Sequence, residues 1–331
     1  MRTGRSVMAL VLAAAMVVSA GCGRDAALSR QADRTYERLL ASAAEAQKAP
    51  AVSHPATVGA VGEGGERLII FAAPLEPDAP AMAGAVGVEA ADVGAAFESI
   101  EGRPFGEILK RDLKEAPRSI GRGFIHSYAK PENLIILGVA FGADRIVRHN
   151  LDGQIRGDLR DNDTSLAETG DFGSVIGNPA LHFGIAGAWY LAAVRGENAQ
   201  HHEMSKTLME ALAVNGLSTM ALKLSMGDES PNGEKWGWPS GHTSSSVCFA
   251  SVLHEFYGWE AGLPLYLLAG YSAASRLEDR EHDLSDIVFG AALGWVVGHS
   301  VAKGELPQVA GFHVLPYGGP DTGGLMFVKS W

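Results

Sequence analysis

The feature that most constrains this fold is a succession of apolar segments of helical length between residues 105 and 302. Apolar residues recur in them at helical spacing, and few alternating β-branched runs interrupt them. The segments are Phe105–Glu115, Ser119–Tyr128, Asn133–Arg148, Ser174–Val194, His202–Met226, Thr243–Tyr257, Leu263–Ser275 and Leu284–Ala302. Such a chain buries its apolar stripes by packing helix on helix. We therefore predict an all-α helical bundle.

The uncharged run from Phe172 to Val194 raises the question of a membrane span. Asn178-Pro179 should break it, because proline prefers the first helical turn. The remaining helix would be about 24 Å long at about 1.5 Å per residue, which is shorter than the bilayer core. The other segments carry charged residues or histidines. We therefore predict a buried core helix and a soluble body.

Three short clusters of polar residues, called islands below, interrupt the apolar sequence between Lys223 and Asp286, and the first of them begins at Lys223. In the last of them, His282 and Asp286 are four residues apart, so on a helix they would share one face. A carboxylate on one imidazole nitrogen fixes the tautomer and leaves the other nitrogen basic, as in a prepared nucleophile. Arg276, six residues before His282, offers a planar, permanently charged group to phosphate oxygens.

The middle island, Pro239-Ser240-Gly241-His242, precedes a helix-like run. We expect the backbone N–H groups of Ser240, Gly241 and His242 to point out of the helix start, where an anion is favoured. His242 there can protonate a leaving oxygen. The islands together therefore indicate a phosphate site.

These residues resemble the type 2 phosphatidic-acid phosphatase superfamily, which also contains the bacterial class A acid phosphatases and the vanadium haloperoxidases. The family shows Lys, six residues, Arg-Pro; then Pro-Ser-Gly-His; then Ser-Arg, five residues, His, three residues, Asp. The second and third elements match in full between Pro239 and Asp286. In the first element Lys223 and Pro231 are in place, but Ser230 stands where the family has its first Arg. The resemblance covers residues 170–302.

The resemblance implies a fold and a reaction. The fold is the helical bundle of the phosphatase and haloperoxidase type, and the reaction is metal-independent hydrolysis of a phosphate monoester or a lipid phosphate, without a cofactor. His282 would be the nucleophile that forms a phosphohistidine, Asp286 would orient it, and His242 would protonate the leaving alcohol and then activate water. The phosphate would be held by Lys223, Arg276, Ser240 and the backbone of Gly241.

Other chemistry is compatible with the same residues. The pocket could hold vanadate as the cofactor of a haloperoxidase, or the chain could be a degenerate lipoprotein that only binds phosphorylated ligands. His242, His282 and Asp286 could ligate zinc, although Lys223 and Arg276 make little sense around a cation. A Ser240-His282-Asp286 hydrolase would lack the Gly-x-Ser-x-Gly elbow.

The N-terminus reads as an export signal. Arg2 and Arg5 precede the apolar run Val7–Val18, which ends at Ser19-Ala20-Gly21-Cys22. This ending resembles the lipobox of bacterial lipoproteins, which implies acylation of Cys22 and a lipid anchor in the periplasm or cell envelope, on the outer membrane of a Gram-negative cell. An ordinary signal peptide is the alternative. The only other cysteine is Cys248, expected to pack as a small hydrophobe.

Composition and pattern suggest four regions. We predict a lipoprotein signal in residues 1–22, an N-terminal helix (Asp25–Ala46) and flexible tether in 23–96, a helical phosphatase domain in 97–303, and a C-terminal tail, a possible hairpin, in 304–331. Leu68–Phe71 suggests a short strand within the second region. The net charge of 27 − 38 = −11 argues against nucleic acid as a partner. The expected partners are a phosphorylated small molecule or lipid phosphate, and the membrane through the anchor.

The absence of the first family arginine generates a prediction. A missing guanidinium removes up to two charge-assisted hydrogen bonds, each worth on the order of 1.5–3 kcal/mol, and Lys235 is a candidate for partial substitution. Ser230→Arg should therefore lower the inhibition constant of inorganic phosphate, measured by competition with an aryl phosphate. An unchanged constant would mean that the pocket is not short of a cation.

Overall fold

The computed structural model describes residues 58–61, 67–74, 100, 102–161, 170–304, 308–309, 312–319 and 322–330. The predicted signal peptide with Cys22 and the predicted helix Asp25–Ala46 lie outside the described residues. The described chain falls into two compact units. One contains helices α3 to α11, and the other contains strands β1 to β5.

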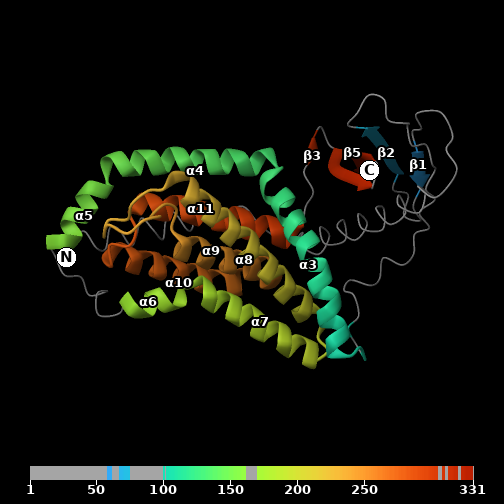
Figure 1. Ribbon diagram of the computed structural model, residues 1–331, viewed down its shortest axis with the longest axis horizontal. Coiled ribbons are helices and arrows are strands. Elements are labelled where there is room, and N and C mark those ends of the chain that lie inside the picture. Colours follow the sequence, from blue (N-terminus) through green and yellow to red (C-terminus); the bar gives the residue numbers. More distant parts are fainter. Residues whose placement is uncertain are drawn as a thin grey trace. The chain divides into compact units, whose positions relative to one another are not determined.

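The first unit is built of helices alone within residues 102–161 and 170–304, so the predicted all-α bundle is confirmed for it (Figure 1). The helices are α3 (Phe105–Tyr128), α4 (Pro131–Asn150), α5 (Asp152–Asp161), α6 (Gly170–Ile176), α7 (Pro179–Arg195), α8 (Ala199–Met226), α9 (Gly241–Tyr257), α10 (Trp259–Glu278) and α11 (Leu284–Lys303).

Local chemistry explains most of these boundaries. Helix α7 begins at Pro179, as predicted, and the side chain of Asn178 caps it by accepting the N–H of Ala180. The two segments predicted before Tyr128 are one helix, α3, which contains Pro117. Helix α5 was not predicted, because only Ile155 and Leu159 repeat at helical spacing in a short charged stretch.

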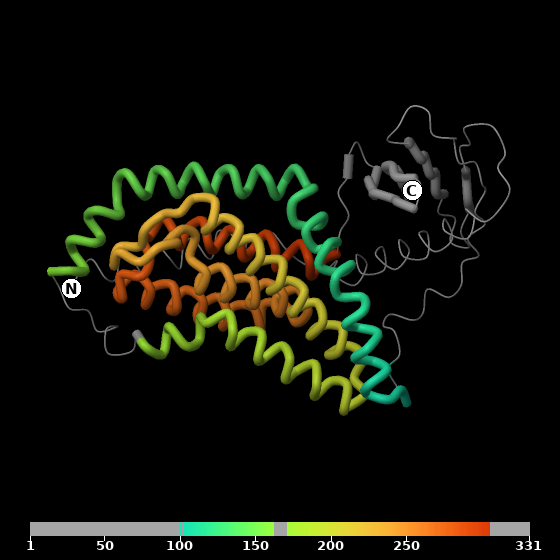
Figure 2. The backbone as a smooth tube through the Cα atoms, in the orientation of Figure 1, coloured from blue at the N-terminus to red at the C-terminus, as the bar shows by residue number. Residues whose placement is uncertain are grey.

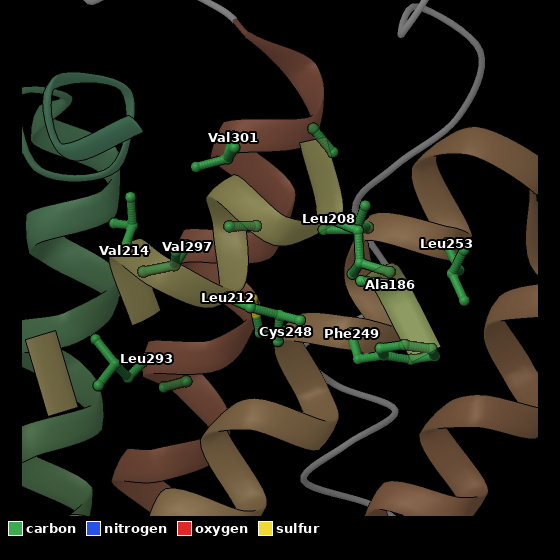
Figure 3. Close-up of a cluster of buried hydrophobic side chains, with 14 of the residues drawn as sticks. Ala186, Leu208, Leu212, Val214, Cys248, Phe249, Leu253, Leu293, Val297 and Val301 are labelled. Carbon is green, nitrogen blue, oxygen red and sulfur yellow. The ribbon is translucent and has the colours of Figure 1, made fainter. Parts of the chain in front are cut away.

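Helix α9 is the centre of the bundle. It packs against α7, α8, α10 and α11, while α4 covers the other side of α11 (Figure 2). The buried cluster between α7, α8, α9 and α11 includes Leu212, Phe249 and Val297, with the thiol of Cys248 fully buried among them as predicted (Figure 3). Burial raises the pKa of this thiol, so Cys248 behaves as a packing residue.

Three glycines on one face of α11 allow α9 to approach closely. A Cβ placed on Gly290 would lie 2.8 Å from the carbonyl oxygen of Ser240, and one on Gly294 would lie 2.2 Å from that of Ser244. A Cβ on Gly298 would lie 2.6 Å from the carbonyl oxygen of Cys248. The opposing atoms are backbone, which has little room to move. The two helices can therefore be this close only because these positions lack side chains.

The second unit contains one antiparallel sheet with the strand order β1-β2-β5-β4-β3. Its strands are β1 (Val58–Val61), β2 (Arg67–Pro74), β3 (Gln308–Val309), β4 (Phe312–Gly319) and β5 (Thr322–Ser330). The predicted tail hairpin is confirmed as β4 and β5, and the predicted strand Leu68–Phe71 lies within β2. Residues 58–61 were predicted to be part of a tether, but they form β1 because β2 supplies its hydrogen-bond partners.

The outer faces of the bundle carry many large apolar side chains. Those exposed by more than a third belong mainly to α4, α7, α8 and α10, and they include Ile135, Val139, Leu224 and Leu267. Of the helices in residues 102–161 and 170–304, only α11 has the length and composition of a membrane span, and 78% of that window is buried in the protein. The prediction that α7 is a buried core helix is therefore wrong: Leu181, Phe183, Ile185 and Leu191 are each more than a third exposed, and α11 is the buried apolar helix.

The close approach of α9 and α11 can be tested with Gly294→Ala. The added methyl group would meet the backbone of Ser244, so we expect a loss of about 1–3 kcal/mol in the free energy of unfolding. Chemical denaturation followed by circular dichroism measures this loss. Gly138→Ala on α4 is the matched control, because nothing lies within 4 Å of its Cβ position and alanine should stabilise that helix by about 0.5–1 kcal/mol. Equal effects of the two substitutions would contradict the packing argument.

Candidate active site

The residues predicted from the three islands come together at the ends of four helices. Lys223 lies in the last turn of α8 and Arg276 in the last turn of α10. Ser240 caps the start of α9, and Asp286 lies in the first turn of α11. The bundle therefore gathers at one place groups that are up to 286 − 223 = 63 residues apart in the sequence.

His282 does not lie on α11, so the prediction that it shares a helical face with Asp286 is wrong. Helix α11 begins at Leu284, and Asp283 is the residue that precedes it. The Asp286 Oδ2 atom accepts the Asp283 N–H at 3.0 Å, the backbone contact that a capping box makes at a helix start. His282 is thus outside the helix, yet its Nδ1 is 3.4 Å from Asp286 Oδ2 and both side chains are buried.

Helix α9 presents its start to the same place. The Ser240 Oγ atom accepts the Thr243 N–H at 3.4 Å and lies 3.0 Å from Thr243 Oγ1. The Ser240 N–H was predicted to point at an anion, but it donates to the Asp286 carbonyl oxygen at 3.2 Å, because the glycine face of α11 brings the two backbones together. The N–H groups of Gly241 and His242 remain at the positive end of the α9 dipole.

His242 is neutral at neutral pH. Burial, and after it the positive charge of Arg276, lower the pKa of its imidazole to about 4. Glu281 acts in the opposite direction, and His282 and His182 make smaller contributions that favour the neutral form. Because Arg276 and His282 both shift the pKa of His242, the two predicted catalytic histidines and Arg276 lie close enough to interact electrostatically.

Lys223 and Arg276 both have protein partners in this structure. Lys223 Nζ donates to the carbonyl oxygens of Trp236 and Gly237, and a Cβ placed on Gly241 would lie 3.9 Å from its Cε. Burial lowers the pKa of the Lys223 amine, while the negative charge of Asp286 opposes that shift.

The guanidinium of Arg276 is almost completely buried. It donates to Glu281 Oε2 at 2.7 Å and to Asp279, both of which are more than a third exposed. The two carboxylates balance the charge of the guanidinium and remain partly accessible to water.

The turn that carries Ser230 is held by a hydrogen bond between its own backbone groups. Ser230 N–H donates to the Glu234 carbonyl oxygen at 2.8 Å, and the side chain of Lys235 is exposed. Trp238 is buried against Phe289 with ring centroids 4.5 Å apart, and its indole N–H donates to Asp144 at 3.1 Å. Trp238 therefore packs beneath the turn, while the side chain of Trp236 is about half exposed.

Sequence reasoning missed the contribution of α4 and α5. Arg148 donates to Asp286 Oδ1 at 3.1 Å, and Arg156 donates to Asp283 Oδ1 at 2.6 Å. Asp152 accepts the Ser285 hydroxyl at 2.7 Å. The charged end of α4 was visible in the sequence, but nothing in it indicated that these side chains meet the start of α11. No group of three or more His, Cys, Asp or Glu side chains able to hold a metal occurs in the part of the chain that the structure describes.

Comparison with known proteins agrees with the pattern of the islands. Residues 219–305 match the family model of the PAP2 superfamily. A lipid A 1-phosphatase of Porphyromonas gingivalis is 37% identical over 93 residues, which is 26% of this chain and 20% of that protein. A lipid A 4'-phosphatase of Helicobacter pylori is 30% identical over 59 residues, which is 18% of this chain and 30% of that protein. The chain thus spans a fifth to a third of these relatives, and no solved structure matches it.

The environment of His242 makes a prediction for titration. Its imidazole signal, followed by nuclear magnetic resonance and assigned with His242→Gln, should titrate near pH 4 rather than near 6.5. Arg276→Gln removes a neighbouring positive charge, so the midpoint should rise in that variant. A midpoint near 6.5 in the unmodified protein would show that His242 is neither desolvated nor close to Arg276.

Proposed function

Because residues 219–305 belong to the PAP2 superfamily of type 2 phosphatidic-acid phosphatases, we propose that this chain hydrolyses phosphate esters through a phosphohistidine on His282. The observation that carries the proposal is the buried pair of His282 and Asp286, with nitrogen and oxygen 3.4 Å apart, beside two cations and a helix start. This arrangement provides a nucleophile, a group that orients it and positive charge for a phosphate.

In the first step the Nε2 lone pair of His282 attacks phosphorus, and the bond from phosphorus to the ester oxygen breaks. Asp286 faces Nδ1, so it favours the tautomer with the proton on Nδ1 and leaves Nε2 as the nucleophile. The ring gains positive charge as the P–N bond forms, and the carboxylate stabilises that charge. The contact of 3.4 Å would shorten to a hydrogen bond when substrate is bound.

His242 serves both steps of this scheme. Its imidazole is neutral in the empty site, but a phosphate dianion beside it would favour the imidazolium and raise its pKa. It can then give a proton to the departing oxygen. In the second step it takes a proton from water, the water oxygen attacks phosphorus, and the P–N bond breaks to release inorganic phosphate.

Lys223, Arg276 and the N–H groups at the start of α9 would hold the phosphate oxygens. Binding requires that Glu281 and Asp279 leave the guanidinium, because the phosphate competes for the same donors. Ser240 would contribute mainly by fixing the start of α9, since its hydroxyl already bonds to Thr243.

The substrate class we propose is a lipid phosphate. Two observations support this choice: both curated relatives named above are lipid phosphatases by name, and apolar side chains of α8 and the neighbouring turn are exposed beside Lys223. These side chains are Leu224, Met226 and Trp236. Apolar surface next to a phosphate site suits a ligand with a charged head and an apolar tail.

The remaining parts of the proposal concern location and organisation. We propose that the chain is exported and anchored through acylated Cys22, with residues 97–303 as the catalytic body. The anchor would hold the site beside a membrane surface that contains its substrate. Acylation is measured by mass spectrometry of the mature chain and should disappear in Cys22→Ser.

The reaction is tested by measuring phosphate release by the full chain in detergent from p-nitrophenyl phosphate and from phosphatidic acid. His282→Ala should lower the rate by roughly a thousandfold or more, because it removes the nucleophile of the proposed scheme. His201→Ala, at the start of α8 and outside the site, is the matched control and should leave the rate unchanged.

The same assay examines the role of metals. Activity should persist in EDTA, since the scheme uses only protein groups. Loss of activity on chelation, restored by zinc, would favour the zinc interpretation instead. Release that is equal in wild type and His282→Ala would contradict the phosphohistidine scheme.

A further inference from the structure

Arg148 joins the buried Asp286 to a partly exposed turn of the site, and it lies on a helix that the family match does not include. It lies near the end of α4, outside residues 219–305. Its Nη2 donates to Asp286 Oδ1 at 3.1 Å, and its Nη1 donates to Asp228. Asp228 begins the turn that carries Ser230, and its carbonyl oxygen accepts the Gly237 N–H at 2.8 Å. One guanidinium thus ties the orienting carboxylate to the neighbouring turn.

The two oxygens of Asp286 have different tasks. Oδ1 accepts from Arg148, and Oδ2 accepts the Asp283 N–H at 3.0 Å while facing His282 Nδ1 at 3.4 Å. A carboxylate held through both oxygens cannot rotate about its last bond without losing one of these contacts. Arg148 therefore fixes the direction in which Oδ2 faces the imidazole.

The charge balance supports the same role. Asp286 is almost fully buried, and a buried carboxylate without a cation is costly. Burial alone would lower the pKa of Arg148, but Asp228, Asp286 and Asp144 raise it, so the guanidinium stays charged. Both of its terminal nitrogens are bound to carboxylates. Arg148 differs from Arg276, whose two carboxylate partners are both more than a third exposed, because its partner Asp286 is almost fully buried. The geometry therefore indicates that Arg148 stays bound to Asp286 and positions it.

Helix α5 braces the same segment independently. Asp152 accepts both the Ser285 N–H at 3.3 Å and the Ser285 hydroxyl, and Arg156 binds the Asp283 side chain. Three side chains from α4 and α5 therefore contact Asp283 and the first turn of α11. Of these three, only Arg148 touches the carboxylate that faces the nucleophile.

We propose that Arg148 is a positioning residue for the hydrolytic reaction, acting through Asp286 to orient His282. The inference rests on the proposed function and adds to it a residue outside the three family motifs. It also gives the turn that carries Ser230 a contact with α4, since Arg148 pairs with Asp228 at the start of that turn.

A double-mutant cycle on the full chain tests this role, with Arg148→Gln, Asp286→Asn and the double variant assayed on p-nitrophenyl phosphate. Arg148→Gln should lower kcat by roughly tenfold to a hundredfold with little change in KM, because misplacing the nucleophile affects the reaction more than binding. In the Asp286→Asn background the same change should alter kcat by less than about threefold, since the residue it acts through is already impaired.

Two further variants separate positioning from folding and from general loss of charge. Arg148→Lys keeps a charge that can reach one carboxylate, so it should recover part of kcat. Arg160→Gln on α5 is the matched control, because Arg160 is an exposed arginine whose partner among the described residues is the exposed Asp161 at 3.3 Å. It should leave kcat unchanged. Circular dichroism and thermal unfolding of each variant report whether the fold is retained.

The outcomes distinguish this inference from the proposed function. Suppose that wild type releases phosphate and that this release depends on His282. If the double variant then loses kcat by the product of the two single-variant factors, Arg148 does not act through Asp286 and the inference is wrong. A rise in KM with unchanged kcat would also overturn it, because Arg148 would then be a phosphate ligand.

If wild type releases no phosphate, the proposed function fails by itself, and the same cycle is measured with orthovanadate as the probe. Vanadate adopts the geometry of the phosphoryl transition state, so its affinity reports the orientation of His282 without turnover. Weaker binding in Arg148→Gln but no further weakening in the Asp286→Asn background supports the inference. Independent effects, or no vanadate binding by wild type, would overturn it.

Discussion

The close contact between α9 and α11 is the constraint on which the rest of the site depends. Glycines at 290, 294 and 298 let the backbone of α11 approach the carbonyl oxygens of α9. At the site end of this contact the Ser240 N–H reaches the Asp286 carbonyl oxygen at 3.2 Å. The start of α9 and the start of α11 are therefore fixed relative to each other by backbone, and the side chains that carry the chemistry inherit that fixed geometry.

Burial of charge is the second constraint. Each of three cations donates at least one hydrogen bond: Lys223 to a carbonyl oxygen, Arg148 to the buried Asp286 and Arg276 to the partly exposed Glu281. Charges held this way are expensive to bury but keep a fixed direction, which suits a site that must stabilise a developing negative charge. In the proposed reaction, a phosphate dianion would change the charge state of the site, because His242 is neutral without it and the partners of Arg276 are exposed.

Helices outside the segment that matches the family model also contribute residues to the site. Helices α4 and α5 precede residues 219–305, yet they supply Arg148, Asp152 and Arg156 to the start of α11. The start of α11 lies within the matched segment, but its charged and polar groups find partners on the preceding helices, which complete the site. The departure at Ser230 is best understood in that setting, because the turn around it is held by contacts from α4 as well as by its own hydrogen bonds.

The sequence by itself determined the helical class, most helix positions and the residues of the three polar islands, because apolar periodicity and motif spacing are local properties. It placed the break at Asn178-Pro179 correctly for the same reason. The sequence-based prediction was wrong where the geometry depends on contacts between elements. His282 lies outside α11 because Asp283 and Asp286 cap that helix, and the Ser240 N–H donates to a carbonyl oxygen of α11. Only the tertiary structure decided that Arg148 meets Asp286 across 138 residues, and that β2 pairs with β5, since long-range contacts follow from packing rather than from any local pattern.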